Sequence, residues 1–252
     1  MAPSGMRDCS DVTDRIESVH EPVAEDAGRP RAGPQGRGVI VWVAAVIVSV
    51  IAVSWGAGVF ITASSDIGAW DRSVLRWMAD HRESGLTDAM RVVTHFGSSN
   101  VVIALMGVAV GGAYLRSRYE GWLAFFAAAA VGTFVLDNLI KLLVQRPRPG
   151  FAMITEVSGW AFPSGHSAMA AALFVTVAFV ASRWAARNRL IWVWIGSACG
   201  AVLVGFSRVY LGAHWTTDVM FGLALGAFWT IAMARVSGLW PPPERDRPER
   251  AK

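Results

Sequence analysis

Hydrophobic residues are gathered along this chain into six long blocks, with polar segments between them. A helix needs about 20 mainly apolar residues to cross the hydrocarbon core of a bilayer. The pattern therefore predicts an all-α polytopic membrane protein with six transmembrane helices. The second and fourth blocks are short, so we expect their ends to extend into the flanking polar residues. The predicted spans are Val39–Thr62, Asn100–Leu115, Gly121–Val144, Ser167–Ser182, Leu190–Phe206 and Thr217–Val236.

Three polar segments lie outside these blocks. Residues 1–37 contain scattered Gly and Pro and show no apolar periodicity, which predicts a disordered tail. Residues 238–252 form a second polar tail, so the membrane domain is expected over 38–237. Between the first two spans, Asp71–Phe96 alternates apolar with charged residues. We interpret it as one or two helices at the outer membrane interface, or as a plain connector with helical content, and assign it no chemistry.

The composition agrees with a membrane protein. Charged residues make up 17% of the chain, against about 25% in a typical soluble domain. The net charge of +4 does not indicate nucleic-acid binding, because the basic residues lie in loops between apolar blocks. Cys9 and Cys199 have no metal-type spacing, and a disulfide between a polar tail and an apolar block is not expected. We interpret both cysteines as inert.

The distribution of arginine predicts the orientation in the membrane. Lys and Arg are enriched in cytoplasmic loops. If six spans alternate, four arginine groups fall on one side, which we predict to be cytoplasmic, with both chain termini, in the cell membrane. The extracytoplasmic side then receives residues 64–99, 145–166 and 207–216. The four groups are Arg29, Arg31 and Arg37; Arg116 and Arg118; Arg183, Arg187 and Arg189; and Arg235, Arg245 and Arg247.

Two histidines near the predicted outer face suggest acid–base or nucleophilic chemistry. His214 and Asp218 are four residues apart, so on a helix they would share one face and could touch. A carboxylate on one imidazole nitrogen would leave the lone pair of the other free, which makes His214 a candidate nucleophile and Asp218 its orienting residue. His166 follows Ser164 and Gly165 at the start of an apolar block. There Ser164 could cap a helix whose amides bind an anion, Gly165 would allow close approach of the backbone, and His166 could act as a general acid.

Cations accompany both histidines. Lys141 ends the third span, where Asp137 one turn earlier could hold it in place. Pro149 restricts Arg148 to an extended backbone, so its guanidinium could be aimed outward from the loop. Arg208 lies where the fifth span reaches the surface, and arginine suits bidentate contacts to phosphate. Arg146 receives no role and is interpreted as solvating the loop or contacting lipid headgroups.

These clusters resemble the signature of the type 2 phosphatidic acid phosphatase family, the membrane relatives of the vanadium haloperoxidases. That signature is Lys, six residues and Arg-Pro; then Pro-Ser-Gly-His; then Ser-Arg, five residues, His, three residues and Asp. The resemblance covers about Trp70 to Val236. The matching positions are Lys141 with Arg148-Pro149, then Pro163-Ser164-Gly165-His166, then Ser207-Arg208 with His214 and Asp218.

The resemblance implies a mechanism that agrees with the roles assigned above. His214 would attack phosphorus and form a phosphohistidine, and Asp218 would orient it. His166 would protonate the leaving group and then help to activate water. No cofactor or metal is implied, and a neutral His214 with a protonated His166 predicts a bell-shaped pH profile. The phosphoryl oxygens would be held by Lys141, Arg148, Ser164, Gly165 and Arg208.

Three functions remain open at this point. The first is a lipid phosphatase in the bilayer that acts on a polyprenyl pyrophosphate, phosphatidic acid or phosphatidylglycerol phosphate. The second is a phosphotransferase that passes the same phosphoryl group to an acceptor other than water. The third is a non-catalytic lipid-binding protein or transporter, although internal repeats typical of transporters are not evident. The sequence does not indicate an oligomeric state.

Overall fold

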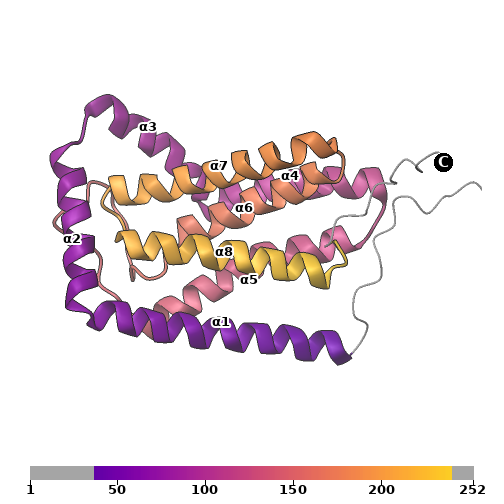
Figure 1. The fold of residues 1–252 in the computed structure, drawn as a ribbon, viewed down its shortest axis with the longest axis horizontal. Helices are drawn as coiled ribbons and strands as arrows, with labels where there is room; N and C mark the ends of the chain where they lie inside the picture. Colours follow the sequence, from indigo (N-terminus) through magenta and orange to yellow (C-terminus); the bar gives the residue numbers. More distant parts are fainter. Residues whose placement is uncertain (1–36, 240–252) are drawn as a thin grey trace, which may run out of the picture. The chain divides into compact units, whose positions relative to one another are not determined.

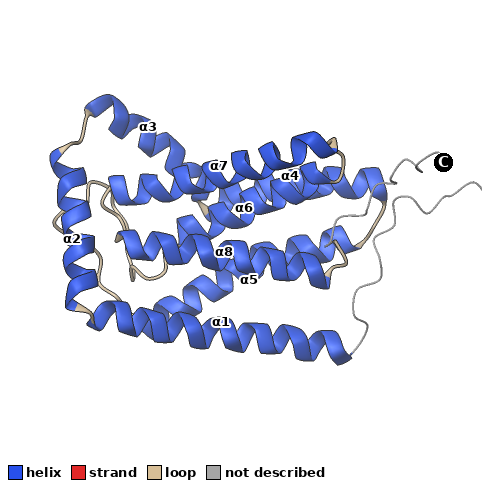
Figure 2. Cartoon of the chain, viewed as in Figure 1, coloured by secondary structure: helices blue, strands red, loops and turns tan. Residues whose placement is uncertain are grey.

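The computed structural model describes residues 37–239, so the predicted tails over 1–36 and 240–252 lie outside the described residues. Within this range the chain forms α-helices and two short 3-10 turns, joined by loops (Figure 2). The prediction of an all-α fold is therefore confirmed. The elements are α1 (Arg37–Ala63), α2 (Ser65–Asp80), α3 (Ser84–Thr94), η3 (His95–Gly97), α4 (Ser99–Ser117), α5 (Gly121–Val144), α6 (Gly165–Ser182), η4 (Arg187–Arg189), α7 (Leu190–Tyr210) and α8 (Thr216–Val236).

Six of these helices are long and apolar enough to cross a membrane, as the sequence predicts. The third span has the predicted bounds, Gly121–Val144. The fifth is longer than predicted, because α7 continues to Tyr210. Ser207 and Arg208 therefore lie in the last helical turn and not in a loop. Both side chains are buried. The apolar block ends at Phe206, but the helix continues for four more residues.

Helix α6 is the centre of the bundle. It packs against α8 and α7, and also against α4 and α5. Its contact with α8 is close because small residues face each other there: a Cβ on Gly226 would collide with the backbone of Ala168. Small residues at helix interfaces let backbones approach one another inside a membrane. This packing fixes the first turns of α6 and α8 beside each other, and both carry residues of the predicted site.

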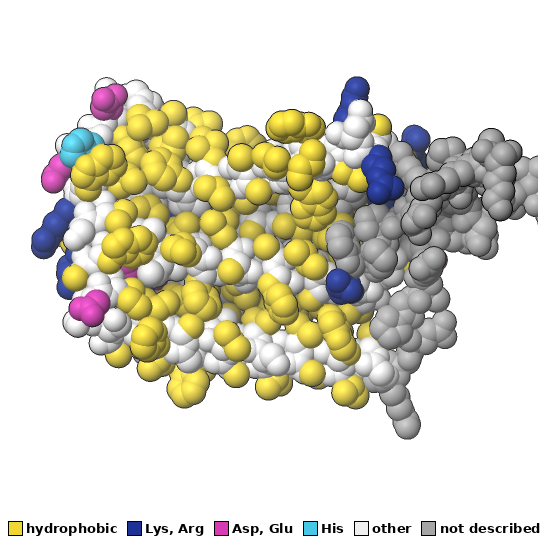
Figure 3. Space-filling view, viewed as in Figure 1, with side chains coloured by type: hydrophobic (Ala, Val, Ile, Leu, Met, Phe, Trp, Pro, Cys, Tyr) yellow, Lys and Arg dark blue, Asp and Glu magenta, His cyan; other side chains and the backbone are white. Residues whose placement is uncertain are grey.

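The outer face of the bundle is apolar. Side chains of α1 such as Ile40, Val48 and Phe60 are largely exposed, although α1 packs on α5 and α8. In Figure 3, hydrophobic side chains cover the middle of the face shown, and charged side chains gather at its two ends. A continuous exposed apolar surface of this kind marks a membrane-facing region. The protein is thus a multi-pass membrane protein.

Helices α2 and α3 lie at one end of the bundle (Figure 1). The amphipathic segment forms two helices, as predicted, but the first begins at Ser65, before the predicted start at Asp71. On α2, Trp70 and Trp77 are exposed while Asp71 and Leu75 are buried. The burial of Asp71 was not predicted, and its side chain pairs with Arg146, as described below.

Candidate active site

The predicted residues meet at the end of the bundle that carries α2. Beside this end lies a cavity of about 380 Å³ that is lined from several helices and two loops. Six of the eight predicted residues line it, while Ser164 and Asp218 are buried behind its wall. The six are Lys141, Arg148, Gly165, His166, Arg208 and His214. Residues more than 70 positions apart in the sequence therefore face one space.

His214 is held with one ring nitrogen toward the backbone and the other toward a cation. Its Nδ1 lies 2.8 Å from the carbonyl oxygen of Ala161, and its Nε2 lies 3.1 Å from Nη1 of Arg148. A carbonyl can only accept a hydrogen bond and a guanidinium can only donate one. The proton of the neutral ring is therefore on Nδ1, and the lone pair of Nε2 is directed to the cavity wall that carries Arg148. This is the tautomer that a nucleophilic imidazole needs.

Asp218 does not hold His214 as the sequence spacing suggests. His214 precedes α8 and is not on its first turn, so the rule for two residues four apart on a helix does not apply. The nearest carboxylate oxygen lies 3.7 Å from Nδ1, while Nδ1 bonds to Ala161 instead. That oxygen accepts from the amide of Trp215 at 2.9 Å. The carboxylate is thus near the imidazole and fixed in place, but its hydrogen bonds go elsewhere.

Burial lowers the pKa of His214 well below its usual value, and the nearby cations Arg148, Arg208 and Lys141 lower it further. Both causes disfavour a charged imidazolium. His214 is only 2% exposed, so water does not screen these charges effectively. The ring is therefore neutral under ordinary conditions, which agrees with the tautomer that its hydrogen bonds require.

Arg148 is turned inward, contrary to the expectation that it points out of its loop. Besides its contact with His214, it donates to the carbonyl oxygen of Ala213 at 2.7 Å. It also donates to the carbonyls of Ser158, Gly159 and Trp160, at 3.1, 2.9 and 3.2 Å. These bonds tie the loop before α6 to the loop before α8, with the guanidinium beside His214.

Lys141 and the first turn of α6 form another part of the cavity lining. Lys141 pairs with Asp137 one helical turn earlier, as the sequence predicts. Gly165 begins α6 directly against this pair, and a Cβ on it would lie 2.6 Å from an oxygen of Asp137 and 3.2 Å from Nζ of Lys141. Glycine is required here because any side chain would displace the ion pair.

We predict that Gly165→Ala lowers the turnover number of any reaction at this cavity about ten-fold or more, since a displacement of about 1 Å at a reacting centre can cost 10²-fold. The loss would come from movement of Lys141 and not from unfolding. Gly196→Ala is a matched control, because a Cβ at Gly196 meets open space. Equal turnover numbers for the two purified variants would contradict this account of Gly165.

Ser164 and His166 flank Gly165 at the N-terminus of α6. Ser164 occupies the position before the helix, but its hydroxyl makes no capping bond to the backbone, contrary to expectation. It accepts instead from the hydroxyl of Ser167 at 2.9 Å, and its amide donates to the carbonyl of Asp218 at 3.0 Å. His166 lies in the first turn and faces the cavity. The first amides of a helix have no partner within it, so they are suited to bind an anion.

Arg208 carries buried hydrogen-bond donors without a partner in the described part of the chain. Its side chain is buried, and Nη1 donates to the hydroxyl of Thr94 at 2.8 Å. Among the described residues, its Nε and Nη2 have no hydrogen-bond partner. Leaving buried donors of a charged group unpaired is costly. An anion with several oxygens, such as a phosphoryl group in the cavity, would satisfy them.

The sequence did not indicate that Arg146 and Asp71 lie buried beside the site. Arg146 is not in contact with bulk solvent: it is 5% exposed and bonds to both Asp71 and Asp218. The interpretation as loop solvation or headgroup contact is therefore wrong. The available signals were weak, namely a second Arg-Pro pair two residues before Arg148 and one acidic residue on an amphipathic helix.

Comparisons with known proteins agree with the fold and the motif. The model of the PAP2 superfamily matches residues 120–240. The chain is 34% identical over 150 residues to phosphatidylglycerophosphatase B of Bacillus subtilis, a match that covers 58% of this chain and 72% of the relative. It is 33% identical over 155 residues to decaprenylphosphoryl-5-phosphoribose phosphatase of Mycobacterium tuberculosis, with coverage of 57% and 76%.

A solved structure is also similar. The crystal structure of a transmembrane PAP2-type phosphatidylglycerolphosphate phosphatase from Bacillus subtilis superimposes with a TM-score of 0.67 and 28% sequence identity. The match covers 74% of this chain and 93% of that one. With the signature residues gathered around one cavity in a six-span bundle, these similarities show that the chain belongs to the PAP2 superfamily of membrane phosphatases.

Proposed function

We propose that this PAP2-type phosphatase hydrolyses a phosphate ester or pyrophosphate of a membrane lipid through a phosphohistidine on His214. The observation that carries the proposal is the environment of its Nε2. A neutral imidazole presents this atom beside Arg148, in a cavity that Lys141 and Arg208 also line. Neutral nitrogen attacks phosphorus, and the surrounding cations stabilise the charge on the phosphoryl oxygens as the transition state forms.

The reaction has two steps. In the first, Nε2 of His214 forms a bond to phosphorus while the bond from phosphorus to the leaving oxygen breaks, and protonated His166 gives that oxygen its proton. In the second, water attacks the phosphohistidine, His166 accepts the proton of the water, and the N–P bond breaks. Inorganic phosphate leaves, and both histidines return to their starting states. His166 provides general acid–base catalysis in both steps, while His214 is the nucleophile of the first step and the leaving group of the second.

The shape of the cavity supports a lipid substrate. Phe134 and Met169 line it together with the cations, and Phe134 is also exposed on the apolar flank of α5. A phosphate at the cations could therefore remain attached to an apolar tail in the bilayer. The named relatives act on phosphatidylglycerophosphate and on a decaprenyl-linked phosphate. Candidate substrates are phosphatidylglycerol phosphate, phosphatidic acid and a polyprenyl pyrophosphate.

The charge distribution supports an active site on the extracytoplasmic face of the cell membrane. Both ends of the described chain lie at the end of the bundle opposite α2 (Figure 1). The helix ends and loops there carry the arginines that the positive-inside rule assigns to the cytoplasm. On this orientation the helices α2 and α3 and the cavity face outward. The arginines concerned are Arg116, Arg118, Arg183, Arg187, Arg189 and Arg235.

We further propose that the reaction needs no metal, because Lys141, Arg148 and Arg208 supply the positive charge that a metal would otherwise provide. Within residues 37–239, groups of three or more His, Cys, Asp or Glu side chains suited to bind a metal are not found. The test is phosphate release in detergent micelles with a chelator present. The panel would contain the three candidate lipids, and a parallel assay would add a soluble alcohol as acceptor.

Chelator-resistant release of inorganic phosphate from at least one lipid is the expected result, and the lipid hydrolysed fastest would identify the substrate class. Transfer of the phosphoryl group to the alcohol, without release of inorganic phosphate, would show that the protein is a phosphotransferase and not a hydrolase. If neither product formed from any member of the panel, the proposal of a lipid phosphatase would be overturned.

The depressed pKa of His214 gives a separate prediction. A histidine whose pKa is lowered on folding stays neutral as the pH falls through its ordinary value of about 6.5. We therefore expect the NMR signal of His214, assigned by its loss in His214→Ala, to titrate with a midpoint below 6.5 in ¹³C-histidine-labelled protein. Activity should accordingly not be lost at pH 6.5 through protonation of the nucleophile. A midpoint at or above 6.5 would contradict the environment described here.

A further inference from the structure

Arg146 lies between two buried carboxylates at the back of the site. Its Nη1 donates to Asp218 at 2.5 Å and to the hydroxyl of Thr217 at 2.7 Å. Its Nη2 donates to Asp71 at 2.8 Å. Both aspartates are fully buried. One planar guanidinium thus bridges a carboxylate of α2 and a carboxylate of α8, an arrangement that the fork of arginine suits and a single ammonium does not.

Asp71 fixes the far side of this bridge. One of its oxygens accepts from the amide of Thr217 at 3.1 Å, and the other accepts from the hydroxyl of Thr217 at 2.6 Å as well as from Arg146. Asp71 therefore binds the first turn of α8 directly, and it also orients the arginine that binds Asp218. Through these contacts the interfacial helix α2 reaches the start of α8, next to His214.

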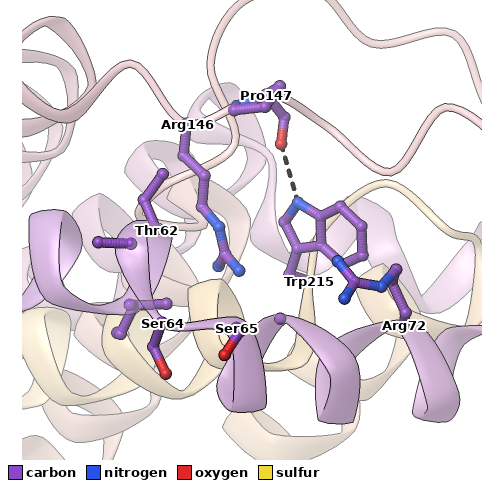
Figure 4. A pocket seen from close by; sticks show the side chains of 10 residues that line it. Thr62, Ser64, Ser65, Arg72, Arg146, Pro147 and Trp215 are labelled. Carbon is purple, nitrogen blue, oxygen red and sulfur yellow. Dashed lines mark hydrogen bonds between the residues drawn. The ribbon is translucent and has the colours of Figure 1, made fainter.

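The main chain of Arg146 makes a second connection to the nucleophile. Its carbonyl oxygen accepts from the amide of Ala161 at 2.8 Å, and the carbonyl of Ala161 accepts from Nδ1 of His214. In addition, the guanidinium lies 5.4 Å from the ring centre of Trp215, whose indole donates to the carbonyl of Pro147 at 2.8 Å (Figure 4). His214 is thus connected to Arg146 through Ala161, and its neighbour Trp215 is bonded to Pro147.

Arg146 does not touch the substrate space. It is absent from the lining of the catalytic cavity and lines a separate pocket of about 250 Å³, between the start of α2 and the loop after α5 (Figure 4). Two carboxylates neutralise its charge, so it does not form an anion site of its own. Any effect on the reaction must therefore pass through Asp218, Ala161 and His214.

We propose that Arg146 and Asp71 are positioning residues for catalysis: together they fix Asp218 and the loop of His214, so that the interfacial helix α2 is a structural part of the active site. This inference rests on the proposed phosphatase function. It assigns the orientation of His214 to a chain of contacts from α2 to α8, whose last members are the bond of Asp218 to the amide of Trp215 and the bond of Ala161 to Nδ1 of His214.

The test compares Arg146→Lys, Arg146→Ala and Asp71→Asn with the wild type, on the lipid that the wild type hydrolyses fastest. A geometric error at a reacting centre lowers turnover more than binding. We expect kcat to fall about 10²-fold for Arg146→Ala and about ten-fold for Arg146→Lys and Asp71→Asn, with KM changed less than about three-fold. Because both residues act in one chain, the double variant Arg146→Lys/Asp71→Asn should lose less than the product of the two single losses.

The exposed pair Asp88 and Arg91 on α3 is a matched control, since it is the same type of ion pair in solvent. Asp88→Asn and Arg91→Lys should keep wild-type kcat. Folded protein is measured for each variant by size exclusion and thermal unfolding. If Arg146→Ala does not fold, the kcat values of Arg146→Lys and Asp71→Asn test the proposal. The proposal is overturned if folded Arg146→Lys and Asp71→Asn keep kcat within two-fold of wild type, or if their losses only follow the folded fraction. An inactive wild type would instead overturn the proposed function.

Discussion

His214→Ala is expected to lower kcat by about 10⁴-fold or more, as removal of a nucleophile does in other enzymes that work through covalent intermediates. On the proposed mechanism the substitution removes the atom that bonds to phosphorus, and the cations beside it, Arg148 and Lys141, cannot replace it as nucleophiles. Substrate affinity should change far less, since the cations remain. The measurement is the initial rate of phosphate release at saturating lipid.

His81→Ala is the matched control for this substitution. His81 is an exposed histidine at the C-terminal end of α2, where it stacks on Trp77 and bonds to its carbonyl. Its removal should leave kcat within about two-fold of wild type, as is usual for surface positions. If His214→Ala kept a kcat as close to wild type as His81→Ala does, another group would have to attack phosphorus.

Arg208→Met is expected to separate activity from stability. Activity should fall about 10²- to 10³-fold, the usual cost of removing one group that stabilises transition-state charge. The ligand-free protein should be at least as stable as wild type, because a buried guanidinium with two unpaired donors is replaced by an apolar side chain of similar length. The loss of one bond to Thr94 is small by comparison.

Thermal unfolding with and without inorganic phosphate measures both effects. Phosphate should raise the melting temperature of the wild type, since a ligand that binds the folded state stabilises it. It should not raise that of Arg208→Met. Arg189→Met, at the opposite end of the bundle, should behave as wild type. A large drop in melting temperature for Arg208→Met, with phosphate still stabilising it, would show that Arg208 holds the fold and not the anion.

Hydropathy predicts the spans well because burial in lipid depends on local composition, and Gly121–Val144 is found with the predicted bounds. It fails where a helix end is buried by protein. Arg208 lies beyond the apolar block that ends at Phe206, yet it belongs to the last turn of α7 and is buried, with Nη1 bonded to Thr94 of α3. Such burial depends on tertiary packing, which a window of sequence does not contain.

In the candidate site, too, the residues can be predicted from the sequence, but their tertiary contacts cannot. Motif spacing is enough to predict that His214, His166 and the three cations belong to one site, and all five line the same cavity. It does not predict that Nδ1 of His214 bonds to the carbonyl of Ala161, 53 positions away. Nor does it predict the bridge from Arg146 to Asp71, 75 positions away, because a buried ion pair looks in sequence like two surface charges.

The most direct test of the central claim is a pre-steady-state burst with p-nitrophenyl phosphate. Its leaving group needs no general acid, so His166→Ala should form the phosphohistidine readily and hydrolyse it slowly. We predict a burst of about one nitrophenolate per active site in His166→Ala, and none in His214→Ala or in the double variant. A burst that persists without His214, or turnover by His166→Ala with no burst, would contradict a covalent intermediate on His214.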